Sequence, residues 1–327
     1  STGMYSEGST TTNLVNAGTI ESSGNGSIGL LYKPGTIATA NAMLINTGII
    51  NMTGDQNVAL YGTNMSGVIS TYGISNSGTI TMGANTIGLY GHEAFVTGGS
   101  LTLGDGGVGI YSQSKDVTLS GGTITVGGNE AVGVYTLGSG QNIINSGTSI
   151  NIGNTSYGFV NVGTGNSITS SLTNNTLGSE SVYIYSSDLT GTVTNSTNLI
   201  STGSQNYGIY SAGTVNNSGN MDLSSGVGNV GIYSVSGGTA TNTATISIGA
   251  SDIDNEFFGI GMAAGFKGDA ESIPIKRPFS GNIINSGIIN VNGKSSIGMY
   301  ATGSGSTVTN NNTINLNANN TTGIFLD

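Results

Sequence analysis

The side chains best suited to contact a ligand gather in one segment, residues 249–281. This segment holds five of the 16 acidic residues, three of the six Lys and Arg residues and four of the seven Phe residues. Carboxylates accept strong hydrogen bonds from cationic groups, and aromatic and Arg side chains are common binding hot spots. A loop whose Phe side chains only pack on the rest of the protein is the alternative. The residues that we expect to contact a ligand are Asp252, Asp254, Glu256, Phe257, Phe258, Lys267, Lys276, Arg277 and Phe279.

Catalytic chemistry has little support elsewhere in the chain. A nucleophilic triad needs a base, and the only candidate is His92, which we expect to be an exposed, solvated loop residue beside Glu93. The carboxylates outside the segment are scattered, although stacking of repeats could still bring two of them together. There is no Cys, and the run from Asp252 to Glu256 lacks the sixth-place Gly and the twelfth-place Glu of a calcium loop. We therefore predict no catalytic residue, no metal site and no cofactor.

A repeat of two short sequence motifs, which we call phrases, must position these residues. One phrase is Asn285-Ser286-Gly287-Ile288-Ile289, and the other is Ile297-Gly298-Met299-Tyr300. Copies of the second phrase recur along the whole chain, with steps of 21 to 39 residues between closing aromatic positions. Periods of this length indicate a solenoid. Short β-branched runs, separated by Asn, Gly and Ser clusters, indicate strands rather than helices.

The predicted fold is all-β, a right-handed parallel β-helix of about twelve coils with roughly 25 residues in each coil. Strands that recur without tight hairpin turns favour parallel stacking of each strand on its copy in the next coil. We predict one solenoid segment over 1–327, with 249–281 as an inserted loop that projects from it. Because the chain begins and ends inside a repeat, we expect it to be a piece of a longer array.

Two side-chain ladders follow from this arrangement. In the phrase from Ile87 to Tyr90, the period of two predicts that Ile87 and Leu89 point inwards and that Gly88 and Tyr90 point outwards. The Tyr ladder is expected to be structural, with an aromatic platform for sugars as the alternative. Asn at the start of the first phrase predicts a stack of amides bonded from coil to coil. Its expected members are Asn16, Asn46, Asn76, Thr97, Ser120, Asn145, Asn174, Asn195, Asn217, Asn242, Asn285 and Asn310.

Composition excludes some partners. The formal charge is −10 and basic residues are few, so we expect no nucleic-acid partner. No apolar run reaches the length of a membrane-spanning helix, so we expect no membrane insertion by this segment.

The paired phrases Asn76-Ser77-Gly78-Thr79-Ile80 and Ile87-Gly88-Leu89-Tyr90-Gly91 resemble the passenger repeats of the large fusobacterial type V autotransporter adhesins. These include the arginine-inhibitable and galactose-binding types. The resemblance covers nearly all of the chain outside 249–281 and carries over no functional residue. It implies an outer-membrane passenger at the cell surface that attaches to other bacteria or host cells. We expect the segment to be a non-catalytic monomer whose partner is a surface protein or glycan. The alternatives are a carbohydrate-active β-helix enzyme, of the polysaccharide lyase or hydrolase type, and a purely structural stalk.

Overall fold

The computed structural model describes residues 1–8, 13–34, 43–62, 73–265 and 280–327. Its backbone contacts divide the chain into two compact units, Ser1–Val160 and Asn161–Asp327. The described residues form 35 strands and no helix. No helix in this part of the chain therefore has the length and apolar character needed to span a bilayer.

In the first unit, one strand per coil belongs to a parallel sheet that we call sheet A. Its members are β1 (Thr2–Gly8), β4 (Ile28–Pro34), β7 (Val58–Gly62), β10 (Ile87–Gly91), β12 (Val108–Ser112), β14 (Val132–Thr136) and β17 (Tyr157–Asn161). The other strands complete the coils and are β2 (Leu14–Asn16), β3 (Thr19–Ser22), β5 (Met43–Asn46), β6 (Ile49–Met52), β8 (Gly73–Asn76), β9 (Thr79–Met82), β11 (Glu93–Leu103), β13 (Val117–Val126), β15 (Asn142–Asn145) and β16 (Ser149–Ile152).

The second unit repeats this plan. Its sheet A strands are β20 (Val182–Ser186), β23 (Tyr207–Ser211), β26 (Val230–Ser234), β29 (Ile260–Ala264), β32 (Ile297–Ala301) and β35 (Thr322–Leu326). The remaining strands are β18 (Ser167–Ser170), β19 (Asn175–Leu177), β21 (Thr192–Asn195), β22 (Leu199–Ser201), β24 (Thr214–Asn217), β25 (Met221–Val227), β27 (Thr239–Asn242), β28 (Thr245–Ala250), β30 (Asn282–Asn285), β31 (Ile288–Val291), β33 (Thr307–Asn310) and β34 (Thr313–Leu316).

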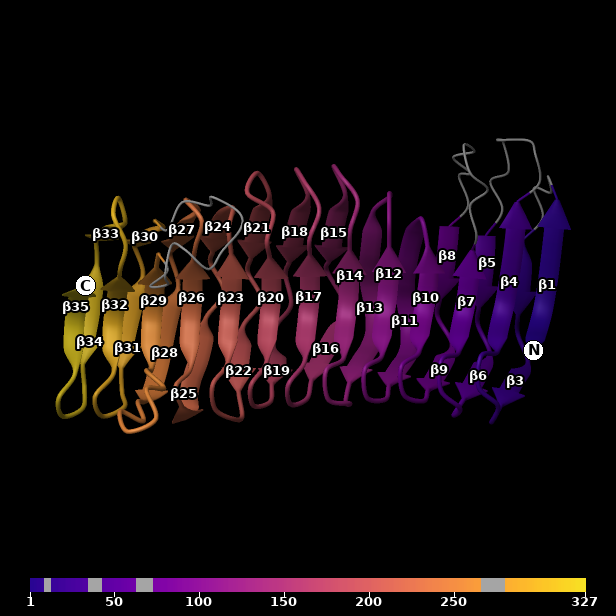
Figure 1. Ribbon diagram of the computed structural model, residues 1–327, viewed down its shortest axis with the longest axis horizontal. Helices are drawn as coiled ribbons and strands as arrows, with labels where there is room; N and C mark the ends of the chain where they lie inside the picture. Colours follow the sequence, from indigo (N-terminus) through magenta and orange to yellow (C-terminus); the bar gives the residue numbers. More distant parts are fainter. Residues whose placement is uncertain (9–12, 35–42, 63–72, 266–279) are drawn as a thin grey trace, which may run out of the picture. The chain divides into compact units, whose positions relative to one another are not determined.

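Each strand pairs in parallel with its copies in the adjacent coils, as Figure 1 shows for the labelled strands within each unit. In the first unit β10 pairs with β7 and β12, and Leu89 lies opposite Leu60 and Ile110. In the second unit β27 pairs with β24 and β30. This stacking confirms the parallel β-helix. The right-handed sense and the number of coils stay predictions.

The inner layer of sheet A differs from simple alternation. Leu89 is fully buried and Tyr90 is half-buried, as predicted. The prediction for Ile87 and Gly88 was wrong, because Ile87 is half-exposed and Gly88 is buried. A Cβ atom on Gly88 would lie 2.6 Å from the carbonyl oxygen of Gly109 and 2.9 Å from Leu101. Gly88 therefore faces the core, where adjacent coils approach too closely for a side chain.

The predicted amide stack is confirmed as two runs of bonded Asn side chains. In the first unit Asn16 donates to Asn46 and Asn46 donates to Asn76, each at 2.8 Å. In the second unit the run passes from Asn195 to Asn310, with Nδ2–Oδ1 distances of 2.8 to 3.0 Å.

Three expected members of the stack were wrong. Sheet register places Val96, Leu119 and Ser170 at this position, whereas Thr97, Ser120 and Asn174 are exposed. Aliphatic residues replace the amides in the long strands β11 and β13. At β18 Ser170 takes the place of the amide. Its Oγ lies 2.8 Å from the buried hydroxyl of Tyr183, a residue that occupies the inner position held by Gly in other sheet A strands.

The outer face of sheet A carries the predicted aromatic ladder. In the first unit the rings of Tyr61, Tyr90, Tyr111 and Tyr135 stack with centroid separations of 4.7, 5.2 and 5.3 Å. Tyr32 is not part of this ladder, because Leu31 lies opposite Tyr61 and Tyr32 is buried. Rings stacked in this way cover one another's faces, which leaves mainly ring edges for a ligand.

Candidate functional site

The segment 249–281 is interrupted by a strand of the solenoid. Its first two residues end β28, and Ile260–Ala264 form β29, in which Met262 lies opposite Ile232 and Met299. The expectation of one inserted loop over 249–281 is corrected accordingly. Sequence reasoning missed β29 because Ala263 takes the ladder position that Tyr233 and Tyr300 hold in the adjacent coils.

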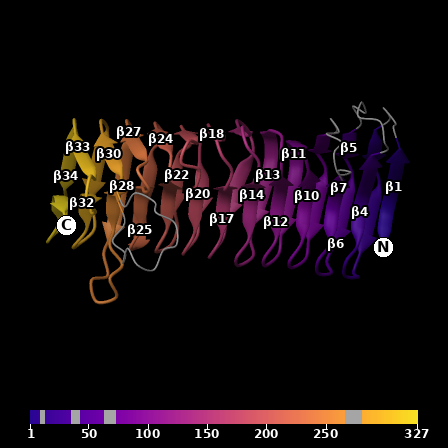
Figure 2. The same cartoon turned by 45° about the horizontal axis from the view of Figure 1, so that its top comes forward.

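What leaves the coil in the described part of this segment is a short loop between β28 and β29, residues 251–259. We call it the 251–259 loop. Figure 2 shows this orange loop extending further than the neighbouring turns of its unit. At its base the backbones of Asp252 and Phe257 exchange two hydrogen bonds, of 2.8 and 2.9 Å. This antiparallel bridge holds residues 253–256 as a projecting tip.

The three acidic residues of the loop have different environments. The Asp252 carboxylate accepts hydrogen bonds from the Asn255 side chain at 2.8 Å and from the Asn255 backbone at 3.3 Å. These two hydrogen bonds from Asn255 hold the pKa of Asp252 below its usual range. Asp254 and Glu256 are exposed, and within the described residues no side-chain hydrogen bond or ion pair engages either carboxylate. Asp252 thus shapes the loop, while the other two carboxylates stay accessible to a ligand.

The two aromatic residues of the loop also differ. A Cβ atom on Gly228 would lie 2.7 Å from Phe257 Cβ, so the backbone at Phe257 lies directly against the preceding coil. Phe258 faces a hollow on the outer side of sheet A. Both side chains keep 39% of their surface exposed.

The hollow beside Phe258 has a volume of about 730 Å³. The first residues of three sheet A strands, Ile260, Ile297 and Thr322, lie along it, and the loop contributes Glu256 and Phe258. On its other side the Tyr300 and Phe325 rings stack at 5.9 Å, and the Tyr300 hydroxyl donates to Asp327 Oδ2 at 3.3 Å. The described residues that line it are Glu256, Phe258, Ile260, Ser295, Ile297, Tyr300, Thr322, Phe325 and Asp327. The hollow combines apolar, aromatic and carboxylate surfaces, and none of the described residues that line it is basic.

The structure brings only part of the predicted contact set to this hollow. Glu256 and Phe258 line it, whereas Asp252, Asp254 and Phe257 do not. Lys267, Lys276, Arg277 and Phe279 lie outside the described residues. Sequence reasoning missed Tyr300, Phe325 and Asp327 as site residues because the repeat marked the two rings as structural. Only knowledge of the register could place them opposite the 251–259 loop.

His92 is not the exposed loop residue that we expected. It is buried, its Nδ1 atom contacts Ser114 Oγ, and its backbone carbonyl accepts a hydrogen bond from Ser112 Oγ. Burial first, and the nearby positive charge of Lys115 second, lower the pKa of His92. The expectation failed because His92 is the single residue between β10 and β11 and is not part of a loop, and Ser112 and Ser114 of the next coil contact it.

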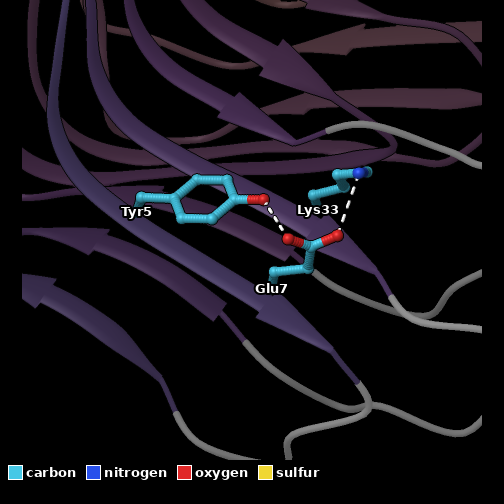
Figure 3. A network of polar contacts seen from close by, with 3 residues as sticks. All are labelled: Tyr5, Glu7 and Lys33. Carbon is cyan, nitrogen blue, oxygen red and sulfur yellow. Dashed lines mark hydrogen bonds and ion pairs between the residues drawn. The ribbon is translucent and has the colours of Figure 1, made fainter.

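Charged clusters are sparse in the other described residues. At the edge of the first unit, the Tyr5 hydroxyl donates to Glu7, and Glu7 lies 2.9 Å from Lys33 Nζ (Figure 3). The bond from Tyr5 and then Lys33 lower the pKa of Glu7. The described ranges contain no group of three or more His, Cys, Asp or Glu residues that could hold a metal ion. In the part of the chain that can be described, the carboxylates therefore form no larger acidic cluster.

Comparison with known proteins gives one match. Residues 91–325 match the family model of the BigA third pectate lyase-like domain. No curated protein and no solved structure matches the chain. The matched region covers most of the sequence, and its pectate lyase-like description agrees with the parallel β-helix.

Proposed function

Starting from the premise that the chain belongs to the BigA third pectate lyase-like domain family, we propose that it is a non-catalytic segment of a bacterial surface adhesin. In this proposal it is part of an autotransporter passenger displayed outside the outer membrane. The resemblance of its repeats to the large fusobacterial adhesins supports the more specific assignment. The segment acts as a monomer and attaches to a protein or glycan on other bacteria or host cells.

The observation that carries the proposal is the 251–259 loop. Elsewhere on the coils, buried polar side chains bond to backbone groups and to one another, as Asn217 does with Asn195, Asn242 and Gly219. The loop instead leaves the coil and presents two carboxylates without described partners beside an aromatic hollow. Loops held on a rigid scaffold are the usual position of binding residues.

The test compares binding of two proteins to bacterial and host cells. One is the chain as it stands. In the other, residues 253–256 are replaced by Asn-Gly, because a hydrogen-bonded pair such as Asp252 and Phe257 is compatible with a two-residue turn. This change keeps β29, and an unchanged circular dichroism spectrum provides the folding control. We expect the shortened protein to lose most of the binding. Equal binding would move the contact away from the loop, and no binding by either protein would favour a structural stalk.

A carbohydrate-active enzyme is the second candidate, because the family model is pectate lyase-like and two carboxylates line one hollow. Paired carboxylates can act as general acid and base in glycoside hydrolysis. Incubation with polygalacturonate and with neutral polysaccharides, followed by analysis of chain length, separates the candidates. The adhesin proposal predicts no shortening of either substrate. Shortening that Glu256→Gln abolishes would make the protein an enzyme.

A further inference from the structure

The stacked tyrosines of the first unit lie apart from the proposed adhesive loop. Tyr61, Tyr90, Tyr111 and Tyr135 occupy one position in four consecutive coils, because the sheet register pairs each with the next. Their ring centroids lie 4.7, 5.2 and 5.3 Å apart, and the last two pairs are within 5° of parallel. All four side chains are half-buried, so each also meets solvent. The coils therefore hold four phenols against one another at the surface, and we call them the four-ring ladder.

Phenols are the side chains of this protein that lose a single electron most readily. The sequence has 14 Tyr residues but no Trp and no Cys. Removal of one electron and the hydroxyl proton leaves a radical that is shared between the phenol oxygen and the ortho carbons. Two such radicals couple through their ortho carbons to form dityrosine. Rings that a scaffold holds together couple as an intramolecular pair, at a far higher effective concentration than rings of separate molecules.

We propose that the four-ring ladder is a site of oxidative cross-linking, at which dityrosine joins adjacent coils. The oxidant is hydrogen peroxide acting through a haem peroxidase, which takes one electron from each phenol. Each coupling forms one bond between two ortho carbons and breaks one carbon–hydrogen bond on each ring. The two electrons and two protons that leave the rings reduce one hydrogen peroxide to two water molecules. This inference is independent of the adhesive contact at the 251–259 loop.

The cross-link would connect coils that have no other covalent bridge. The chain contains no Cys, so a disulfide cannot join one coil to another. Neighbouring rings of the ladder are 21 to 29 positions apart in the sequence, and each dityrosine therefore closes a loop of one coil. A cross-link of this kind stabilises a fold mainly by restricting the unfolded chain. Oxidation should thus make the first unit harder to unfold.

Two tyrosines are internal controls, because they hold the same position in sheet A but face no phenol there. Tyr5 in β1 lies opposite Leu31 and is 50% exposed. Tyr300 in β32 lies between Ala263 and Phe325, and its ring stacks on the Phe325 ring at 5.9 Å. Both phenols can be oxidised, but neither lies opposite another phenol in the described strands. They separate the effect of the ladder from simple exposure.

The experiment treats the whole chain with a haem peroxidase and a limiting amount of hydrogen peroxide, and then identifies cross-linked peptides by mass spectrometry. We expect at least about tenfold more cross-linking between adjacent rings of the ladder than at Tyr5 or Tyr300, with a yield that does not change when the protein is diluted. The same treatment in concentrated urea should reduce this preference to less than about threefold, because the coils no longer hold the rings together.

A pair of substitutions tests whether the stack directs the coupling. Tyr111→Phe keeps the ring and removes the phenol, so Tyr61 and Tyr90 should still couple while Tyr135 loses its partner. Cross-linking of Tyr135 should then fall at least about tenfold. Tyr5→Phe is the matched control and should leave all three ladder cross-links unchanged. An unchanged circular dichroism spectrum confirms that both variants fold.

Three results would overturn the inference. The first is equal cross-linking of Tyr5, Tyr300 and the four-ring ladder, which would mean that exposure alone decides the site. The second is a covalent dimer of the chain as the main product, with a yield that rises with protein concentration. The third is undiminished cross-linking of Tyr135 after Tyr111→Phe. The adhesin proposal would survive each of them, because it is tested by cell binding of the protein with the shortened loop.

Discussion

The amide stack makes a quantitative prediction at Asn217, in the middle of its longer run. Asn217 is 2% exposed, donates to Asn242 Oδ1 at 2.8 Å and to the carbonyl of Gly219 at 2.9 Å, and accepts from Asn195 Nδ2 at 2.8 Å. Asn217→Ala removes all three bonds and leaves buried polar groups of its neighbours without a partner. At about 1 kcal/mol for each bond, we expect local stability to fall by about 3 kcal/mol.

Hydrogen exchange is the suitable assay, because a solenoid can open locally and need not unfold in one step. A loss of about 3 kcal/mol corresponds to roughly hundredfold faster exchange in β21, β24 and β27. Asn310→Ala is the matched control: Asn310 continues the same run but is exposed, so water can replace its bonds and the change should stay below about tenfold. Acceleration of less than about threefold at Asn217, or an equal effect of both substitutions, would refute the reasoning.

Three further predictions concern buried positions. Gly88→Ala should lower the urea midpoint markedly because its Cβ would lie 2.6 Å from a carbonyl oxygen, whereas Gly98→Ala, whose nearest contact is 3.8 Å, should have little effect. The pKa of His92 is lowered in the folded state, so its stabilising contribution is complete above the unfolded pKa of about 6.5 and is lost as pH falls towards the folded pKa. His92→Gln should therefore make the urea midpoint depend less on pH between about pH 7 and pH 5. An unchanged dependence on pH would contradict this. Tyr183→Phe leaves Ser170 Oγ without the Tyr183 hydroxyl at 2.8 Å and should reduce the free energy of unfolding by about 1–3 kcal/mol, measured by denaturation.

The sequence was informative wherever one side chain repeats with one structural role. The Asn stack, the Tyr ladder and the parallel pairing followed from phrases that recur in register. The predicted positions were wrong in coils where another residue type replaces that side chain. Val96 and Leu119 fill the amide position, and Tyr183 fills an inner glycine position. Each replacement depends on the neighbouring coil, which a single phrase does not reveal.

The site was harder to predict because it depends on register between distant residues. The segment 249–281 was identified by composition, but Ala263 concealed β29 within it. Phe258 and Tyr300 line the same hollow although 42 positions separate them in the sequence. Only the pairing of β29 with β32 brings the 251–259 loop beside the end of the aromatic ladder.

The contact itself can be tested by photo-crosslinking on living cells. A photoreactive phenylalanine analogue at Ile253, which is 57% exposed at the loop tip, is compared with the same group at Leu189, which is 53% exposed on a turn away from the loop. Our account predicts crosslinks to a cell-surface component from position 253 that excess unlabelled chain suppresses, and none from position 189. Crosslinks from position 189 alone, or equal crosslinking from both positions, would contradict the claim that the 251–259 loop makes the adhesive contact.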